Sequence, residues 1–347
     1  MHSKWKDAEK QMKRLCTLYE GYRRTPIVSV HTTLIYRSLD LLYNHEPQTK
    51  LTFEPVRDIL ALYSTAPDEV TDYEFGKGKH YYSAVSSRGL PRFTSGGYYK
   101  NGANKFAPSA RTMLETDYTM ALTLQYAGFN EAAAQYLSRA VHMLADICCL
   151  PHAACWTYFS PKKGVHIGYE DLARIMYPDS VRTQTITPSD LRLFTNESLR
   201  KVLNSIVKAE ADEVQEFLHS PEKEIKKRLL ATEKNVAAFF FRFYKDISLP
   251  PERSHCIKSG MYCRPFADMP PMRTEVRSDG VHLINSATES ELPGRPVFSV
   301  THIRGNKFLL AAVHEKHGKV VEYGKKLSRR FSPNRRDQQL IFSETML

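Results

Sequence analysis

The chain has 347 residues, of which 42% are hydrophobic and 25% are charged. This balance is ordinary for a globular protein and excludes wholesale disorder, and the length allows one large domain or two moderate ones. The formal net charge is +11, and residues 251–347 supply +6 of it, with 16 basic and 10 acidic side chains. A basic surface attracts partners that carry phosphate, and composition alone does not choose between lipid head groups and nucleic acid.

The first residues, MHSKWKDAEKQMKRL, carry charges throughout and lack the apolar run of a secretory signal. No stretch of the sequence reaches the roughly 18 apolar residues of a membrane span. Six cysteines are scattered along the chain without the spacing of a disulfide scaffold. We therefore expect a protein made in a reducing compartment, either cytoplasmic or exported by a signal-independent route, that is peripheral to the membrane.

Helical patterns dominate the chain up to a double proline, Pro250-Pro251. The first predicted helix begins at Thr25, as N-cap, and Pro26, at the first helical position, because apolar residues follow at helical spacing. Residues 80–105 are rich in Gly, Ser, Tyr and basic side chains, which predicts a long surface loop of the kind that often carries function. Further helices are predicted at 107–127, 130–149, 168–176, 188–218 and 222–247.

Beyond the double proline the pattern changes to alternation and turns, which predicts a small sheet with hairpins. We therefore expect three parts: an N-terminal extension (1–24), a helical domain (25–249) and a basic, β-rich C-terminal region (252–347). The last part contains a run of basic side chains, which is usually a solvated face and alternatively docks on an anionic membrane. These side chains are Lys325, Lys326, Arg329, Arg330, Arg335 and Arg336.

Histidines and carboxylates recur at metal-ligand spacings in the helical domain. His142 and Asp146 lie four residues apart on a predicted helix, so both project from one face. His166 and Glu170 repeat this spacing. Further candidates are His31, Asp68, His80 and His152. Imidazole nitrogen and carboxylate oxygen are suitable zinc ligands. A single such pair is more often a solvated helical pair, so the indication comes from having several in this order.

The order of these residues resembles a known family. The run from His142 to Ala154 is similar to the signature of the zinc-dependent phospholipases C, which include the bacterial phosphatidylcholine-hydrolysing enzymes and the clostridial alpha-toxin. In their pattern an Asp follows a His by four residues, a second His comes six later, and a further His precedes a Glu by four. The spacings 142–146–152–166–170 follow this pattern. The segments around His31 and from Asp68 to His80 resemble the family's first helix and its acid-to-histidine segment.

The resemblance implies a mainly α fold, a multi-helix catalytic domain of the zinc phospholipase C and nuclease type, followed by the small β-rich region. It also implies up to three zinc ions. Asp146 would bridge two of them, and Asp68 would also orient or deprotonate the attacking water as the catalytic residue. One zinc of this pair would be completed by Asp68, His80 and His142, and the other by His31. The third zinc would be held by His152, His166 and Glu170.

The sequence departs from the family at its N-terminus. In the family the mature chain starts with a Trp whose amino group binds a zinc beside the first-helix His. Here some thirty residues precede His31, and Trp5 is too distant to match. Glu20 lies eleven residues ahead of His31 and is a candidate substitute. Alternatively, proteolysis exposes a new terminus, or that zinc is weak or absent.

Three substrate hypotheses follow from the resemblance. The favoured one is phospholipid head-group hydrolysis at a membrane surface, giving diacylglycerol and a phosphorylated head group, because Glu170 and its spacing look more like the phospholipases. The alternatives are a single-strand nuclease on the same scaffold, which would make nucleic acid the partner, and a catalytically impaired lipid-binding homologue. Tyr81, Tyr82 and Trp156 are candidate substrate-binding residues that would cage a choline ammonium by cation–π contact. The sequence indicates no obligate protein partner.

Overall fold

The computed structural model describes most of the chain up to residue 249 and the backbone of strands beyond it. The described ranges are 2–22, 29–68, 77–83, 95–96, 98–99, 106–126, 128, 130–157, 162–177, 184–249 and the strands between 262 and 343. The helices are α1 (His2–Tyr22), α2 (Val30–His45), α3 (Lys50–Phe53), α4 (Arg57–Tyr63), α5 (Ala110–Tyr126), α6 (Asn130–Ile147), α7 (Leu150–Ala153), α8 (Lys163–Met176), α9 (Pro188–Asn196), α10 (Leu199–Asp212), α11 (Val214–His219) and α12 (Pro221–Ile247). Short 3-10 turns include η3 (Ala66–Asp68) and η5 (Lys77–His80). The predicted mainly helical domain is therefore confirmed.

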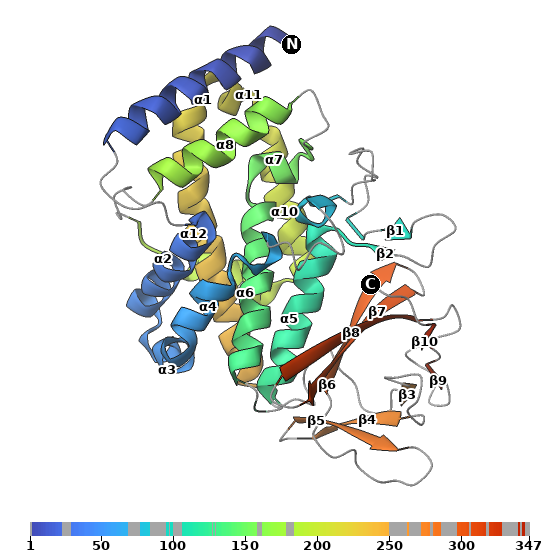
Figure 1. Cartoon of the computed structure of the whole chain (residues 1–347). Coiled ribbons are helices and arrows are strands. Elements are labelled where there is room, and N and C mark those ends of the chain that lie inside the picture. Colours follow the sequence, from blue (N-terminus) through green and yellow to red (C-terminus); the bar gives the residue numbers. More distant parts are fainter. Residues whose placement is uncertain are drawn as a thin grey trace.

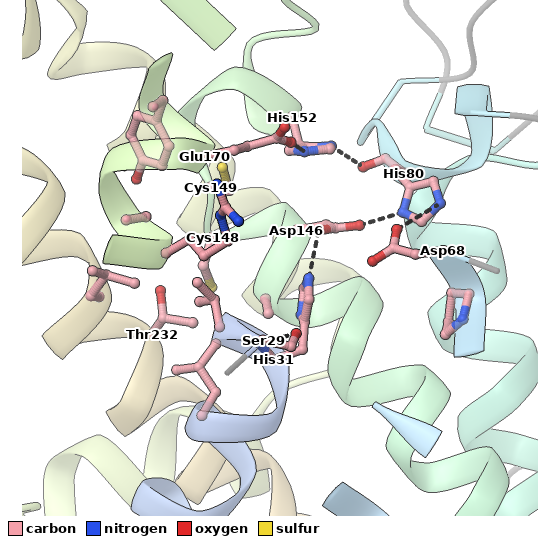
Figure 2. A pocket seen from close by; sticks show the side chains of 18 of the residues that line it. Ser29, His31, Asp68, His80, Asp146, Cys148, Cys149, His152, Glu170 and Thr232 are labelled. Atoms are coloured by element: carbon pink, nitrogen blue, oxygen red, sulfur yellow. Dashed lines mark hydrogen bonds and ion pairs between the residues drawn. The ribbon is translucent and has the colours of Figure 1, made fainter. Parts of the chain in front are cut away.

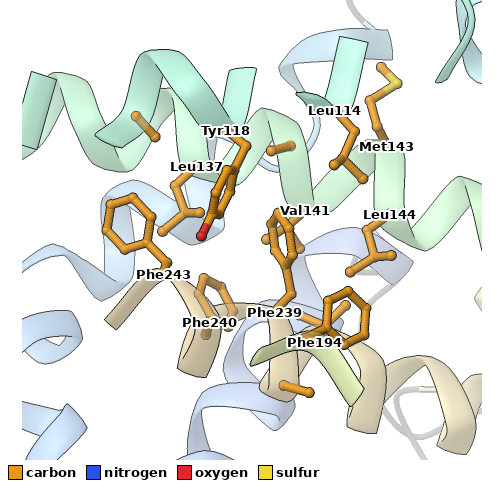
Figure 3. Packing of buried hydrophobic residues seen from close by; sticks show 14 of the residues in the cluster. Leu114, Tyr118, Leu137, Val141, Met143, Leu144, Phe194, Phe239, Phe240 and Phe243 are labelled. Carbon is orange, nitrogen blue, oxygen red and sulfur yellow. The ribbon is translucent and has the colours of Figure 1, made fainter. Parts of the chain in front are cut away.

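Helices α5, α6 and α12 lie side by side in the middle of the helical domain (Figure 1). Three aromatic side chains of α12 are buried in the core: Phe239, Phe240 and Phe243 (Figure 3). The rings of Phe239 and Phe243 pack on Tyr118 of α5. The ring centroids of Tyr118 and Phe239 are 5.0 Å apart. Full burial of one Phe stabilises the fold by about 1.5–3 kcal/mol. This apolar block fixes the position of α6.

A second apolar cluster lies where α1 packs against α8, α11 and α12. Met12 of α1, Leu172 of α8 and Phe217 of α11 are fully buried in it. No helix is predicted from the sequence for the extension 1–24, yet residues 2–22 form α1. Because a charged, weakly apolar segment rarely forms a stable helix alone, its helicity depends on this packing.

A buried ion pair joins α2 to α12. Arg37 Nη1 lies 3.3 Å from Glu233 Oε1, and both side chains are almost fully buried. The Tyr177 hydroxyl donates a hydrogen bond of 2.7 Å to the same Glu233 carboxylate. A buried pair is costly to break because either partner left alone is an uncompensated charge. The pair therefore locks the orientation of α2 relative to α12.

Several helix boundaries differ from the sequence-based prediction; the helix expected at 168–176, for example, begins at Lys163. Helix α2 begins at Val30, and its N-cap is Ser29, whose hydroxyl accepts a hydrogen bond from the His31 backbone N–H. The predicted start at Thr25 and Pro26 lies outside the described residues. The single helix expected over 188–218 is three helices, because Ser198 caps a new helix and the chain turns again at Glu213. Among the described residues, no helix is long and apolar enough to cross a bilayer.

Two strands of two residues each precede α5, and the described strands after α12 have two to ten residues. β1 (Tyr98–Tyr99) pairs antiparallel with β2 (Phe106–Ala107). The later strands are β3 (Tyr262–Cys263), β4 (Met272–Arg277), β5 (Gly280–Asn285), β6 (Val297–Arg304), β7 (Lys307–Lys316), β8 (Lys319–Leu327), β9 (Gln339–Leu340) and β10 (Phe342–Ser343). They are ordered β10-β8-β7-β6 and β5-β4-β3-β9, and β6, β7 and β8 are consecutive antiparallel neighbours. The division of the chain into three parts remains a prediction.

Candidate metal centre

His142 and Asp146 project from one face of α6, as their spacing predicted. The His142 ring is fully buried, and its Nδ1 lies 2.7 Å from the Ser64 carbonyl oxygen. Because a carbonyl only accepts, Nδ1 carries the hydrogen, and the lone pair of the neutral ring is on Nε2. Nε2 lies 3.3 Å from Asp146 Oδ2. The helix thus presents one nitrogen and one carboxylate to the same point.

Three other residues meet α6 at this point, and we call the whole set the five-residue group: His31, Asp68, His80, His142 and Asp146. His80 Nδ1 lies 2.7 Å from Asp146 Oδ2, and His31 Nε2 lies 3.8 Å from Asp146 Oδ1 (Figure 2). Asp68 Oδ1 is 3.7 Å from His142 Nε2 and 3.8 Å from His80 Nε2. The carboxylate of Asp146 therefore has His31 near its Oδ1 atom and His80 and His142 near its Oδ2 atom.

A second set, the three-residue group, consists of His152, His166 and Glu170. Glu170 Oε1 lies 3.0 Å from His152 Nε2 and 2.9 Å from His166 Nε2. The Nδ1 atoms of the two rings donate to the carbonyl oxygens of His80 and Trp156, at 3.0 and 2.5 Å. Both Nε2 atoms therefore face the Glu170 carboxylate. The His80 carbonyl also ties this group to the five-residue group.

Members of both groups line one cavity of about 510 Å³, namely His31, Asp68, His80 and Asp146 of the five-residue group and His152 and Glu170 of the three-residue group. Cys148 and Cys149 at the end of α6 and Thr232 of α12 line it as well (Figure 2). Sequence reasoning missed the carbonyls of Ser64, His80 and Trp156 as orienting groups, because any residue type supplies a carbonyl.

Burial and neighbouring charges shift the pKa values of these groups in the metal-free protein. Burial, together with the nearby His142, lowers the pKa of His31 to about 4. Burial alone would also lower the pKa of His152, but Asp146 and Glu170 raise it to about 9. Burial alone would raise the pKa of Asp146, yet His142 and His152 hold it well below its usual range. The Asp146 carboxylate is thus ionised at neutral pH.

The residues fit a set of divalent cations. Three combinations of ligand atoms each lie within 4.8 Å of one another: His31, Asp68 and His142; His80, His142 and Asp146; and His152, His166 and Glu170. A zinc-binding histidine usually donates its other ring N–H to a carbonyl or carboxylate, and the Nδ1 atoms of His142, His152 and His166 all lie against backbone carbonyl oxygens. The buried Nδ1 of His31 has no hydrogen-bond partner among the described residues, so this ring is held less firmly.

Six of the eight predicted ligands line the cavity, whereas His142 and His166 are fully buried beside it, with their Nε2 atoms 3.3 Å from Asp146 Oδ2 and 2.9 Å from Glu170 Oε1. The other candidates are placed differently. Tyr81 lines the cavity with its ring stacked on His152, with centroids 5.1 Å apart. Tyr82 is buried, and its hydroxyl donates to Asn204. Trp156 is only 1% exposed and does not line the cavity. Glu20 is exposed on α1 and is not among the lining residues either.

No protein-family model matches the sequence, and a search of curated proteins finds no match. Among solved structures, that of Clostridium perfringens alpha-toxin isolated from avian strain SWCP is similar, with a TM-score of 0.54 and 13% sequence identity over 88% of this chain and 98% of that chain. Alpha toxin from Clostridium absonum is also similar, with a TM-score of 0.52 and 14% identity over 87% of this chain and 99% of that chain. At this identity the likeness shows the fold alone, which is the fold of the clostridial alpha-toxins.

Proposed function

We propose that the protein is a zinc-dependent hydrolase of phospholipid head-group phosphodiester bonds, a phospholipase C that yields diacylglycerol and a phosphorylated head group. The observation that supports it most is the convergence of three sets of nitrogen and carboxylate ligands on one cavity. The alpha-toxin fold supports the same reaction class by analogy. The fit of the ligand spacings to the phospholipase C signature favours phospholipid over nucleic acid.

Each group has a distinct role in this proposal. Asp146 would bridge two zinc ions, one completed by Asp68, His80 and His142 and the other by His31. The three-residue group would hold the third zinc. When bound, zinc supplies Lewis acidity, which neutralises the phosphate oxygens, acidifies a bound water and steadies the leaving alkoxide.

Asp68 is suited to accept the proton of the attacking water. Its side chain is 57% exposed, in contrast to the buried Asp146, so substrate and water reach it. Its Oδ1 lies within 4 Å of ring nitrogens of both His80 and His142. We infer that this carboxylate orients the attacking water and accepts its proton. The basic C-terminal region would hold the enzyme on an anionic membrane surface.

Four measurements on the purified protein test the proposal against its alternatives. Zinc per chain is counted first, and the protein is then assayed on a chromogenic phosphorylcholine ester, on phosphatidylcholine vesicles and on single-stranded DNA. We expect zinc, ester cleavage and release of diacylglycerol. Cleavage of DNA alone indicates the nuclease. Zinc-loaded protein that sediments with vesicles and cleaves neither substrate is the impaired lipid-binding homologue.

A further inference from the structure

Helix α1 lies along α8, the helix that carries His166 and Glu170 (Figure 1). Gly168 of α8 allows this close approach, because a Cβ placed there would lie 3.1 Å from Met12 Cε and 3.3 Å from Met12 Cβ. A Cβ on Gly164 would meet only the carboxyl end of the Glu9 side chain. Gly168 sits midway between the two ligands of α8. Any outward displacement of α1 therefore removes packing from the turn that presents them.

The start of α1 reaches the residue that orients His166. The Trp5 ring packs edge-on against the Trp156 ring, with centroids 4.7 Å apart. Lys162 Nζ lies over both rings, 4.5 Å from the Trp5 centroid and 5.3 Å from the Trp156 centroid. The Trp156 carbonyl accepts the hydrogen bond from His166 Nδ1. Helix α1 thus contacts both the helix that carries His166 and the residue that fixes its ring.

The other end of α1 is fixed to α12. The Tyr19 hydroxyl donates to Glu222 Oε1 at 2.5 Å, and Lys226 Nζ donates to the same hydroxyl at 2.9 Å. Between the two ends, Ala8 and Met12 are fully buried in the second apolar cluster, together with Tyr169. The helix is therefore held along its whole length and is part of the fold around the three-residue group.

We propose that α1 is a clamp that positions His166 and Glu170, so that the zinc affinity of the three-residue group depends on its docking. Trp5 and Met12 are positioning residues in this scheme. They touch neither substrate nor metal, and they act through Trp156 and α8. This inference rests on the proposed zinc function and goes beyond it, because it assigns a role to the N-terminal segment that the ligand pattern leaves unexplained.

The test places a larger side chain between α1 and α8. Gly168→Leu places a side chain against Met12 while favouring the helical state of α8. Trp5→Ala removes the contact with Trp156. In both variants we expect one zinc of three to be lost to a chromophoric chelator with about tenfold or greater reduction in affinity, as for other outer-shell changes. The other two zinc ions should keep their affinity. The matched control is Leu18→Ala, because Leu18 is 52% exposed on α1.

A second substitution separates the clamp from direct damage to the site. Met12→Ala removes the atoms that the new leucine meets, and the leucine occupies the space that they leave. The Gly168→Leu/Met12→Ala double variant should therefore restore the packing of α1 on α8 and regain the third zinc. Unchanged zinc affinity in both single variants, equal loss of all three zinc ions, or a double variant that stays impaired would each overturn the clamp. A wild-type protein without zinc refutes the proposed function instead. In that case amide hydrogen exchange tests the clamp without zinc. Relative to the wild-type protein, the variants should exchange faster in α8 and at an unchanged rate in α6.

Discussion

The two ligand groups share a cavity but are built in opposite ways. The five-residue group collects side chains from α2, η3, η5 and α6, and the carboxylate of Asp146, which we propose as the bridge, is buried. The three-residue group comes from two neighbouring helices, and the Glu170 side chain that joins its rings is 39% exposed. A group assembled from distant segments exists only in the folded domain, so metal bound there is coupled to global folding. A group drawn from two helices that follow each other in the chain can lose its metal with less disturbance.

The largest expected effect comes from removing His142, whose Nε2 lies near Asp68, His80 and Asp146. We expect His142→Ala to lose the zinc pair and to lower kcat/KM on the order of a thousandfold or more, because activation of water and clamping of phosphate fail together. Metal analysis and the phosphorylcholine ester assay measure both. His219→Ala is the control, since this histidine is exposed on α11. Retention of both zinc and activity in His142→Ala would refute the five-residue group.

A smaller effect is expected from Glu170→Gln. The amide keeps the shape of the side chain but loses the charge that faces His152 and His166. We expect one zinc fewer per chain and roughly a 10- to 100-fold loss of activity, with the zinc pair retained. Elemental analysis after gel filtration checks the count. Glu216→Gln, at an exposed site on α11, should leave both quantities unchanged. Loss of all zinc from Glu170→Gln would mean that the two groups are not separable.

The dependence of zinc affinity on pH should test the assignment of His152 to the three-residue group. The pKa of His152 is raised to about 9 in the metal-free protein, so between pH 6 and 8 this ring carries a proton that zinc must displace. The affinity of the three-residue group should therefore rise by about tenfold per pH unit and level off near pH 9. His31, with its pKa lowered to about 4, is already neutral and adds no such slope. Competition titrations at three pH values measure this, and a flat profile contradicts the assignment of His152.

Much of the site was predictable because its ligands follow helical spacing. A four-residue step puts His142 with Asp146, and His166 with Glu170, on one face of a helix whatever surrounds them. The docking of α1 was not predictable, because it depends on the glycine face of α8 and on burial of Met12, which carry no periodic signal strong enough to place a charged helix. The helical part of the fold followed from periodicity, whereas breaks such as Ser198 depend on local capping.

The smallest effect is expected at Trp156, which the sequence suggested as a substrate contact. The indole packs against Trp5 and Phe217, and its backbone carbonyl, not its ring, orients His166. Trp156→Phe keeps the carbonyl and an aromatic ring, so we expect a loss of about 1–2 kcal/mol in unfolding free energy. The KM for the phosphorylcholine ester should stay within about twofold, because a ring that does not line the cavity adds no binding energy in ground or transition state. Thermal unfolding and steady-state kinetics measure the two quantities. A KM raised tenfold at unchanged stability would instead place this ring in contact with the head group.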